Sequence, residues 1–206
     1  MADSAAMRKD SREKIAVFSS GEGSTMSYIY EACQSGNLPA DILLLVSNKT
    51  RSGATERAKR HSIDSYLFDT GKNKDTTKTE GDLVSLLKQS KIDWILLLGY
   101  TRKIGPKLLG AFNNRIINTH PSLLPKYGGR GFYGRKIHEA VLASGDILTG
   151  VTVHLVNKEY DSGEILSQIE VPVLPSDSVA TLEARVKATE KAHLVTVLNE
   201  LWTNKN

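Results

Sequence analysis

The stretch INTHPSLLPKYGGRGFYG, residues 117–134, is the most informative part of the sequence for the fold and the function. It continues the apolar run RIIN, which is typical of a buried strand, and Asn118 and His120 alternate in it with Ile117 and Thr119. Side chains of a strand alternate between two faces, so Asn118 and His120 are predicted to share one face at the strand's carboxyl end. Open α/β sheets tend to carry their chemistry at that end. The pattern leaves open whether this is a catalytic site or an ordinary strand end.

On both sides of this stretch, apolar runs of the kind buried in parallel sheets alternate with helical patterns. Strands are predicted at 15–20, 41–48, 65–69, 93–100 and 115–120, and helices at 24–34, 54–61, 81–91, 106–112 and 134–145, the last closed by Gly145. Further on, 148–157 and 164–173 alternate apolar and polar residues, which predicts an antiparallel pair, and a long amphipathic helix follows from Ser178, a candidate N-cap, to about Leu201. This order predicts an α/β fold: a single doubly wound, mostly parallel sheet with a C-terminal antiparallel hairpin and a long terminal helix.

The length of 206 residues suits one good core. One domain is expected over residues 15–206, preceded by a flexible polar tail at 1–14. Within the domain, a phosphate-binding half at about 15–112 and a catalytic half at about 113–206 are expected.

The composition argues against several classes of protein: nucleic-acid binders, disulfide-stabilised proteins, cysteine-cluster metalloproteins and membrane proteins. The net charge of +4 is spread along the chain without a block of like charge, which favours a solvated surface over a nucleic-acid partner. The single cysteine, Cys33, allows no internal disulfide and no cysteine-cluster metal site, so a reducing cytoplasm is expected. No apolar run approaches the roughly 20 residues that a membrane helix needs, so no membrane partner is expected.

The stretch SSGEGST, residues 19–25, leads from a predicted strand through two glycines into a predicted helix. Free backbone N–H groups and the positive end of the helix would face one point there, which is a plausible phosphate site. The stretch is neither a Walker loop nor a complete dinucleotide fingerprint, because Met26 occupies the third glycine position. A tight turn that binds nothing is an equally good interpretation.

Histidines and acids supply further candidates. His120, His138, His154 and Asp161 fit no common metal-ligand spacing, so no metal is predicted. Asn118 and His120, framed by the prolines that follow, could present an amide donor and an imidazole to one substrate atom.

Two other candidates have ordinary explanations. Asp161 lies among turn-forming residues, and spacing alone cannot bring it to His120. Lys187 and Glu190 lie one turn apart on a helix, where a surface ion pair is the default interpretation.

The motifs and their order resemble the glycinamide ribonucleotide formyltransferases, a family that uses 10-formyltetrahydrofolate. The matching segments are SGEGST (20–25), SNK (47–49) with ERA (56–58), GYTR (99–102), NTHPSLLPKY (118–127), GVTVH (150–154) and DSG (161–163). They extend over nearly the whole chain, from about residue 15 to 200. The NTHPSLLP run together with the DSG loop is the specific part of the resemblance, whereas the glycine-rich turn is weak alone.

The resemblance implies the formyltransferase fold and a reaction of purine biosynthesis. The amine of glycinamide ribonucleotide would attack the formyl carbon of 10-formyltetrahydrofolate, the cosubstrate, and no metal would take part. Asn118 would stabilise the oxyanion, His120 would move protons, and Asp161 would favour the protonated imidazole.

The resemblance also implies binding residues. Backbone N–H groups of Gly23, Ser24 and Thr25 would hold the substrate phosphate, and Lys187 and Glu190 would bind the ribonucleotide. The folate would contact Thr101, Arg102, Lys103, Ile104, Asn118, Asn157, Lys158, Glu159, Tyr160 and Asp161. His138 and His154 match recurrent histidines and are expected to support the site.

Some positions depart from the family pattern. Thr25 replaces the usual Asn, and Lys103 replaces an apolar residue of the folate strip. A basic folate contact would fall near Thr76, between Lys74 and Lys78. The stretch GGRGFYG (128–134) is longer than the corresponding loop in many relatives, and its four glycines are expected to form a flexible rim beside the site.

Other functions remain open at this stage. Methionyl-tRNA formyltransferases share the Asn–His–Asp set but usually add a C-terminal RNA-binding domain, and formyltetrahydrofolate hydrolases usually add an N-terminal regulatory domain. Neither addition is expected here. A sugar-amine formyltransferase is a further alternative. A noncatalytic phosphate- or nucleotide-binding protein is the rival from another class, and it would have no need of Asn118, His120 and Asp161 together.

Overall fold

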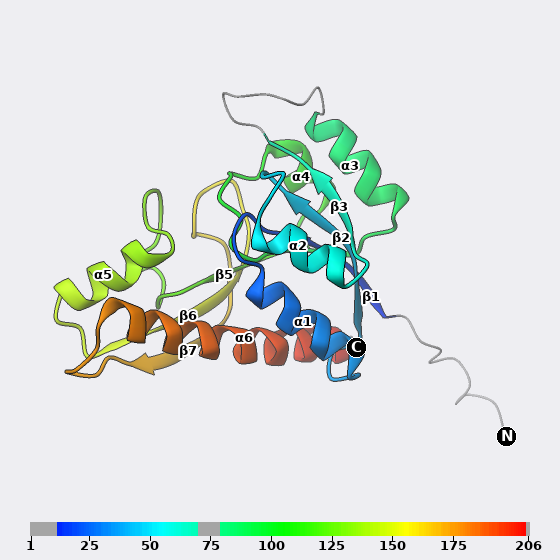
Figure 1. Cartoon of the computed structure of the whole chain (residues 1–206). Coiled ribbons are helices and arrows are strands. Elements are labelled where there is room, and N and C mark those ends of the chain that lie inside the picture. Colours follow the sequence, from blue (N-terminus) through cyan, green and yellow to red (C-terminus); the bar gives the residue numbers. More distant parts are fainter. Residues whose placement is uncertain (1–11, 70–78, 205–206) are drawn as a thin grey trace, which may run out of the picture.

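A computed structural model of the chain describes residues 12–69 and 79–204. These residues form a seven-stranded sheet flanked by helices (Figure 1). The strands are β1 (Glu13–Phe18), β2 (Ala40–Ser47), β3 (Asp64–Leu67), β4 (Trp94–Leu97), β5 (Ile116–His120), β6 (Leu148–Leu155) and β7 (Ile165–Pro172). The helices are α1 (Ser24–Gln34), α2 (Gly53–Arg60), α3 (Glu80–Gln89), α4 (Pro106–Ala111), α5 (Arg135–Ala143) and α6 (Val179–Thr203). Every predicted element is present, in the predicted order.

The sheet order is β3-β2-β1-β4-β5-β6-β7. The pairs from β3 to β5 are parallel, and β5, β6 and β7 pair antiparallel. The chain therefore winds outward from β1 to β3 and returns to the other side of β1 with β4. This confirms the doubly wound sheet, and it places a topological switch point between β1 and β4, where open α/β sheets bind ligands.

Strand β1 shows how the sheet divides the core. Ile15 and Val17 belong to the hydrophobic cluster formed with α1, α2 and α6, whereas Ala16 and Phe18 belong to the cluster formed with α3 and α4. This alternation buries both faces of the central strands, as their continuous apolar sequence predicts. A third cluster joins α5 and α6 to β6 and β7 (Figure 1).

Relative to the prediction, β2 contains a bulge and β4 is shorter. Ile15 pairs with Ile42 and Ala16 pairs with Leu44, so Leu43 is an extra residue in β2, a β-bulge, and its side chain is 38% exposed. Strand β4 ends at Leu97, before the predicted residue 100, and Gly99 follows in a left-handed conformation with φ 73°.

The predicted tail is too long. Residues 1–11 lie outside the described part, but Glu13 and Lys14 belong to β1. Arg12 donates hydrogen bonds to the carbonyl oxygens of Cys33 and Ala40 and pairs with Asp41 at 2.9 Å. The domain therefore begins by residue 12.

Two predicted helix caps, Ser178 and Gly145, can be compared with the structure. Ser178 is the N-cap of α6, and its side chain accepts a hydrogen bond from the Thr181 backbone N–H at 3.2 Å, as predicted. At the end of α5 the C-cap is Ser144, and Gly145, with φ 71°, is the residue after it. No helix in the described ranges is long and apolar enough to cross a membrane.

Candidate active site

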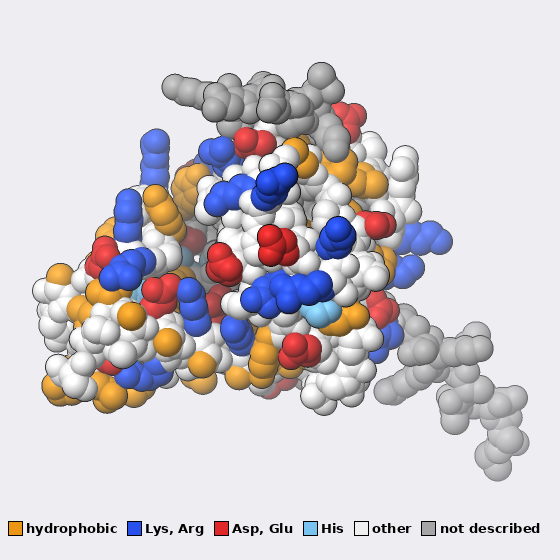
Figure 2. Space-filling view, in the orientation of Figure 1, with side chains coloured by type: hydrophobic (Ala, Val, Ile, Leu, Met, Phe, Trp, Pro, Cys, Tyr) orange, Lys and Arg blue, Asp and Glu red, His pale blue; other side chains and the backbone are white. Residues whose placement is uncertain are grey.

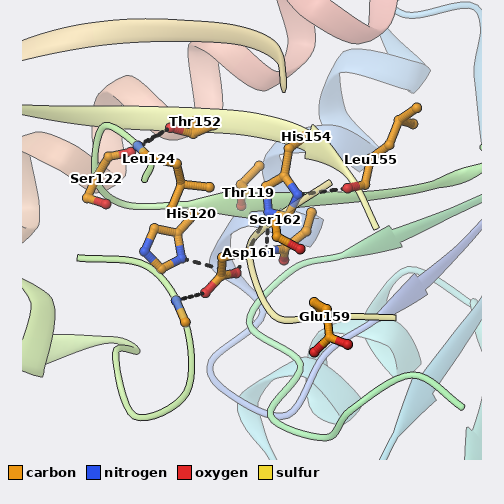
Figure 3. Close-up of polar contacts among 12 residues, drawn as sticks. Thr119, His120, Ser122, Leu124, Thr152, His154, Leu155, Glu159, Asp161 and Ser162 are labelled. Carbon is orange, nitrogen blue, oxygen red and sulfur yellow. Dashed lines mark hydrogen bonds and ion pairs between the residues drawn. The ribbon is translucent and has the colours of Figure 1, made fainter. Parts of the chain in front are cut away.

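The segment after β5 is tied to the neighbouring strands by buried hydrogen bonds (Figure 3). The backbone N–H of Leu124 donates to the Thr152 hydroxyl oxygen at 3.0 Å, and that hydroxyl donates to the Ser122 carbonyl at 2.7 Å. Gln168 of β7 donates to both Leu124 and Thr152. The Leu124–Pro125 peptide bond is cis. These contacts fix the backbone directly after His120.

Replacing Thr152 by Val is expected to lower the free energy of unfolding by roughly 2 kcal/mol and the Tm by roughly 4–8 °C. Thr152 is fully buried, and Val would leave the Leu124 N–H and the Ser122 carbonyl without their partner. Thr149→Val on the same strand is the control, because the buried Thr149 hydroxyl has no hydrogen-bond partner in the described structure. Urea unfolding of both variants measures the difference, and equal losses would contradict the role of Thr152.

Four polar side chains meet at the carboxyl end of β5. Asn118 and His120 come from β5, His154 comes from the adjacent strand β6, and Asp161 comes from the loop between β6 and β7. The Asp161 carboxylate lies 3.5 Å from His120 Nδ1 and 3.8 Å from His154 Nε2. Figure 3 shows the two imidazoles and the carboxylate pointing toward one another. The structure thus brings Asp161 to His120, which spacing alone could not do.

His154 orients the amide of Asn118. The Nδ1–H of His154 donates to the Leu155 carbonyl at 2.8 Å, since a carbonyl oxygen can only accept. Burial lowers the pKa of His154, although the Leu155 carbonyl and Asp161 oppose this, so the neutral ring is favoured. Its Nε2 then accepts a hydrogen bond from the Asn118 amide nitrogen at 3.1 Å. One amide hydrogen of Asn118 is used in this way, and the other remains available.

His120 is 4% exposed, and both of its nitrogens face acceptors. Its Nε2–H donates to the Tyr127 carbonyl at 2.8 Å, while Nδ1 faces the Asp161 carboxylate. Burial raises the pKa of Asp161, but the hydrogen bond and charge of His120 and the Gly129 N–H outweigh it, so the net pKa is below its usual value. Asp161 is therefore held as a carboxylate beside the ring.

The DSG loop is held in place by close backbone contacts. A Cβ at Gly163 would collide with the Leu155 carbonyl oxygen, so only glycine lets the loop fold onto β6. The Gly129 backbone N–H donates to the second oxygen of Asp161 at 2.9 Å. This bond connects Asp161 to the GGRGFYG stretch, which the sequence alone did not indicate.

The cluster opens into a cavity of about 680 Å³. Its lining includes all the predicted folate-contacting residues except Lys158, and it also includes His120, Lys187 and Glu190. The predicted phosphate site, Gly23 to Thr25, is not part of the lining. The basic contact expected near Thr76 falls outside the described residues. The cavity therefore joins the predicted catalytic, folate and ribonucleotide residues in one space.

The family follows from comparison of the whole chain with known proteins. The model of the formyl transferase family matches residues 13–198. The chain belongs to the formyl transferase family. Its resemblance to that family, inferred above from short motifs, is confirmed.

The chain is similar to several named proteins and solved structures. It is 43% identical over 190 residues to the chloroplastic phosphoribosylglycinamide formyltransferase of Vigna unguiculata, covering 92% of this chain and 61% of that protein. It is 38% identical to the Haemophilus influenzae phosphoribosylglycinamide formyltransferase, covering 86% of this chain and 82% of that protein. The crystal structure of the Bacillus halodurans phosphoribosylglycinamide formyltransferase superposes with a TM-score of 0.85 at 32% identity, covering 94% of this chain and 97% of that chain.

In the described structure, the predicted Lys187–Glu190 ion pair is absent. Lys187 pairs with Glu183 at 2.5 Å, one turn earlier on α6, and Glu190 accepts a hydrogen bond from the Thr119 hydroxyl. Burial raises the pKa of Glu190, which Thr119 and the nearby lysines only partly offset. Helical spacing could not predict the partner of Glu190, because Thr119 lies on β5.

The glycine-rich turn before α1 leaves the first backbone N–H groups of the helix without a side-chain cap. Gly23, the N-cap of α1, has φ 71°, and no side chain caps the helix. A Cβ there would lie 2.6 Å from Ala54 Cα, so this position requires glycine. The first backbone N–H groups of α1 thus have no side-chain acceptor at the cap, as an anion site needs.

Other residues that line the cavity were only partly indicated by the sequence. His138 is 1% exposed and lines the cavity, yet its Nδ1 has no hydrogen-bond partner in the described structure. Burial lowers its pKa, so the ring is neutral beside the Glu183–Lys187 pair. Phe132 and Tyr133 add aromatic surface from the GGRGFYG stretch. Within residues 12–69 and 79–204, no group of three or more His, Cys, Asp or Glu side chains could hold a metal ion.

Proposed function

We propose that the chain transfers the formyl group of 10-formyltetrahydrofolate to the amine of glycinamide ribonucleotide. The products are formylglycinamide ribonucleotide and tetrahydrofolate, in a step of purine biosynthesis. The observation that carries the proposal is the meeting of Asn118, His120 and Asp161 in a cavity of about 680 Å³. The names of the relatives support the same acceptor.

The reaction requires a group that stabilises the negative charge of the intermediate and a group that transfers a proton. Attack of the amine on the formyl carbon gives a tetrahedral intermediate with an oxyanion, and the free amide N–H of Asn118 is placed to donate to it. His120 carries a proton from the attacking amine toward the folate nitrogen N10 as the C–N10 bond breaks. Since the Nε2–H of His120 donates to Tyr127 in the free protein, substrate must take over one of its contacts.

Each substrate has its own binding region in this proposal, and only the phosphate region lies outside the cavity lining. Lys187 and Glu190 on α6 hold the ribonucleotide, and the N-terminus of α1 at Gly23, Ser24 and Thr25 holds its phosphate. Helices α1 and α6 pack together in one hydrophobic cluster, which supports a shared nucleotide site. The folate lies between the Thr101–Ile104 segment and the loop at 157–161, whose residues, Lys158 apart, line the cavity.

The direct test is loss of the formyl group from 10-formyltetrahydrofolate with and without glycinamide ribonucleotide. Turnover that depends on the ribonucleotide supports the proposal. Folate consumption without it would indicate a hydrolase, and binding of either compound without turnover would indicate a noncatalytic protein. Both of the latter results would overturn the proposed function.

Replacing Glu190 by Gln is expected to raise the KM for the ribonucleotide about tenfold, with little change in the KM for the folate. One carboxylate oxygen of Glu190 already accepts from the Thr119 hydroxyl, so the other is left to accept from a substrate hydroxyl group, whereas Gln would present there an amide nitrogen that can only donate. Steady-state kinetics with each substrate varied in turn measures the difference. Glu200→Gln, an exposed position on the same helix, is the control. An equal rise in both KM values would count against a nucleotide contact.

The compartment remains a prediction. The single cysteine agrees with a reducing cytoplasm, but the Vigna unguiculata relative is named as chloroplastic.

A further inference from the structure

A short turn, residues 126–129, contacts both members of the proposed catalytic pair. The Tyr127 carbonyl accepts a hydrogen bond from His120 Nε2 at 2.8 Å. Two residues later, the Gly129 backbone N–H donates to the Asp161 carboxylate at 2.9 Å. The position of this turn therefore determines how the imidazole and the carboxylate are oriented before substrate enters.

The backbone of the turn depends on outside contacts for its shape. Tyr127 has φ 58°, in the left-handed region that a bulky residue rarely adopts. A conformation of this kind persists only where the surrounding structure holds it. If the holding contacts were lost, residue 127 would relax toward negative φ, and its carbonyl would turn away from His120.

The contacts that hold the turn come from the end of α5, and we call them the anchor network: Lys126, Tyr127, Ser144 and Asp146. The Tyr127 hydroxyl donates to an Asp146 carboxylate oxygen at 2.6 Å and lies 2.6 Å from the Ser144 hydroxyl. The Lys126 ammonium donates to both Asp146 oxygens, at 2.7 and 2.6 Å. Hydrogen bonds from Lys126 and Tyr127 lower the pKa of Asp146, so it remains a carboxylate. None of these four residues lines the cavity.

We propose that Asp146 positions the pair of His120 and Asp161 from outside the cavity. The link is the Tyr127 side chain, because its bond to Asp146 fixes the turn that contacts the pair. The proposal rests on the proposed function, which gives the pair its catalytic role. Loss of the anchor network should slow the reaction without weakening substrate binding, because the network does not line the cavity. A network that only stabilised the fold would change the Tm and leave kcat as it is.

The test uses Tyr127→Phe and Asp146→Ala. The first keeps the ring among its apolar neighbours and removes only the hydroxyl, and the second removes the acceptor of that hydroxyl. Each should lower kcat about tenfold, with both KM values within about twofold of wild type, as expected for a misplaced catalytic group. Asp146→Asn keeps an oxygen that can accept from the Tyr127 hydroxyl, so its kcat should stay within about threefold of wild type. A loss in Asp146→Asn as large as that in Asp146→Ala would overturn positioning through this hydrogen bond.

The matched control is an ion pair on α5 itself. Figure 2 shows acidic and basic side chains interspersed over this helix. Among them, Arg135 Nε lies 3.0 Å from Glu139 Oε1, both side chains are exposed, and neither lines the cavity. Glu139→Gln removes this pair without touching the turn, so it should keep the wild-type kcat. An equal loss of kcat in Glu139→Gln would overturn the proposal in favour of a general surface-charge effect.

Nuclear magnetic resonance of the ¹⁵N-labelled protein without substrate tests the positioning apart from the reaction. The Gly129 backbone N–H and the His120 Nε2–H both donate to the groups described above, so their proton signals should move upfield in Tyr127→Phe as these bonds weaken. They should stay in place in Glu139→Gln. Unchanged signals in a folded Tyr127→Phe protein would overturn the positioning role.

Failure of the positioning role and failure of the proposed function give different results. Wild-type turnover with glycinamide ribonucleotide, together with an unchanged kcat in folded Tyr127→Phe, would overturn the positioning role alone. Absence of wild-type turnover would overturn the proposed function. In that case the two proton signals still show whether the anchor network orients His120 and Asp161.

Discussion

Replacing His120 by Asn is expected to lower kcat/KM by about 10³-fold, with the loss in kcat rather than in either KM. The Asn amide can take the place of His120 Nδ1, but it is too short to reach the position of Nε2 and cannot take up a proton and release it again. The position is 4% exposed, so the Asn side chain stays beside Asp161, while the hydrogen bond to the Tyr127 carbonyl is lost together with proton transfer. Steady-state kinetics with both substrates near saturation is the measurement.

A control separates chemistry from folding in this variant. His61, half-buried and stacked on Tyr30 with ring centroids 4.1 Å apart, lies outside the cavity lining, so His61→Asn should keep full turnover. The His120 variant should keep the wild-type far-UV circular dichroism spectrum. Near wild-type turnover in a folded His120→Asn protein would remove His120 from the proposed mechanism.

Replacing Asp161 by Asn is expected to lower kcat about 10²-fold. The variant keeps an oxygen that can accept from the Gly129 N–H, and Asn tolerates the left-handed conformation found here, φ 50°. It removes the negative charge beside His120, so the imidazolium formed during proton transfer loses its stabilising partner. A kcat within twofold of the wild-type value would show that the negative charge of Asp161 does not contribute to catalysis.

Replacing Asp161 by Asn is also expected to change how the free energy of unfolding depends on pH. The net pKa of Asp161 is lowered in the folded protein, because His120 and the Gly129 N–H outweigh the effect of burial. The carboxylate therefore stabilises the fold above its unfolded pKa of about 3.9, and this contribution is lost as the pH falls through the folded value. Urea unfolding should show wild type and Asp161→Asn differing at pH 7 and converging at acidic pH. A difference independent of pH would contradict the charged role.

Local patterns were sufficient to predict most of the fold. Period-two alternation and continuous apolar runs depend only on neighbours in the sequence, so each strand and helix could be found within a few residues. The common face of Asn118 and His120 is also a local property, and the structure confirms it. Errors arose where pairing between strands decides the outcome, as at Leu43, where a bulge in the pairing with β1 turns an apolar side chain outward.

The sequence by itself determined the order of elements, the strand-end position of Asn118 and His120 and, through its motifs, the family. Only the tertiary structure decided which partners these residues have. Asp161 reaches His120, and His154 orients Asn118, because β6 pairs antiparallel beside β5 and the DSG loop folds back over it. Glu190 meets Thr119 instead of Lys187 because the fold brings this turn of α6 beside Thr119 of β5. These contacts join residues 36 to 71 positions apart, and no spacing rule in a sequence specifies them.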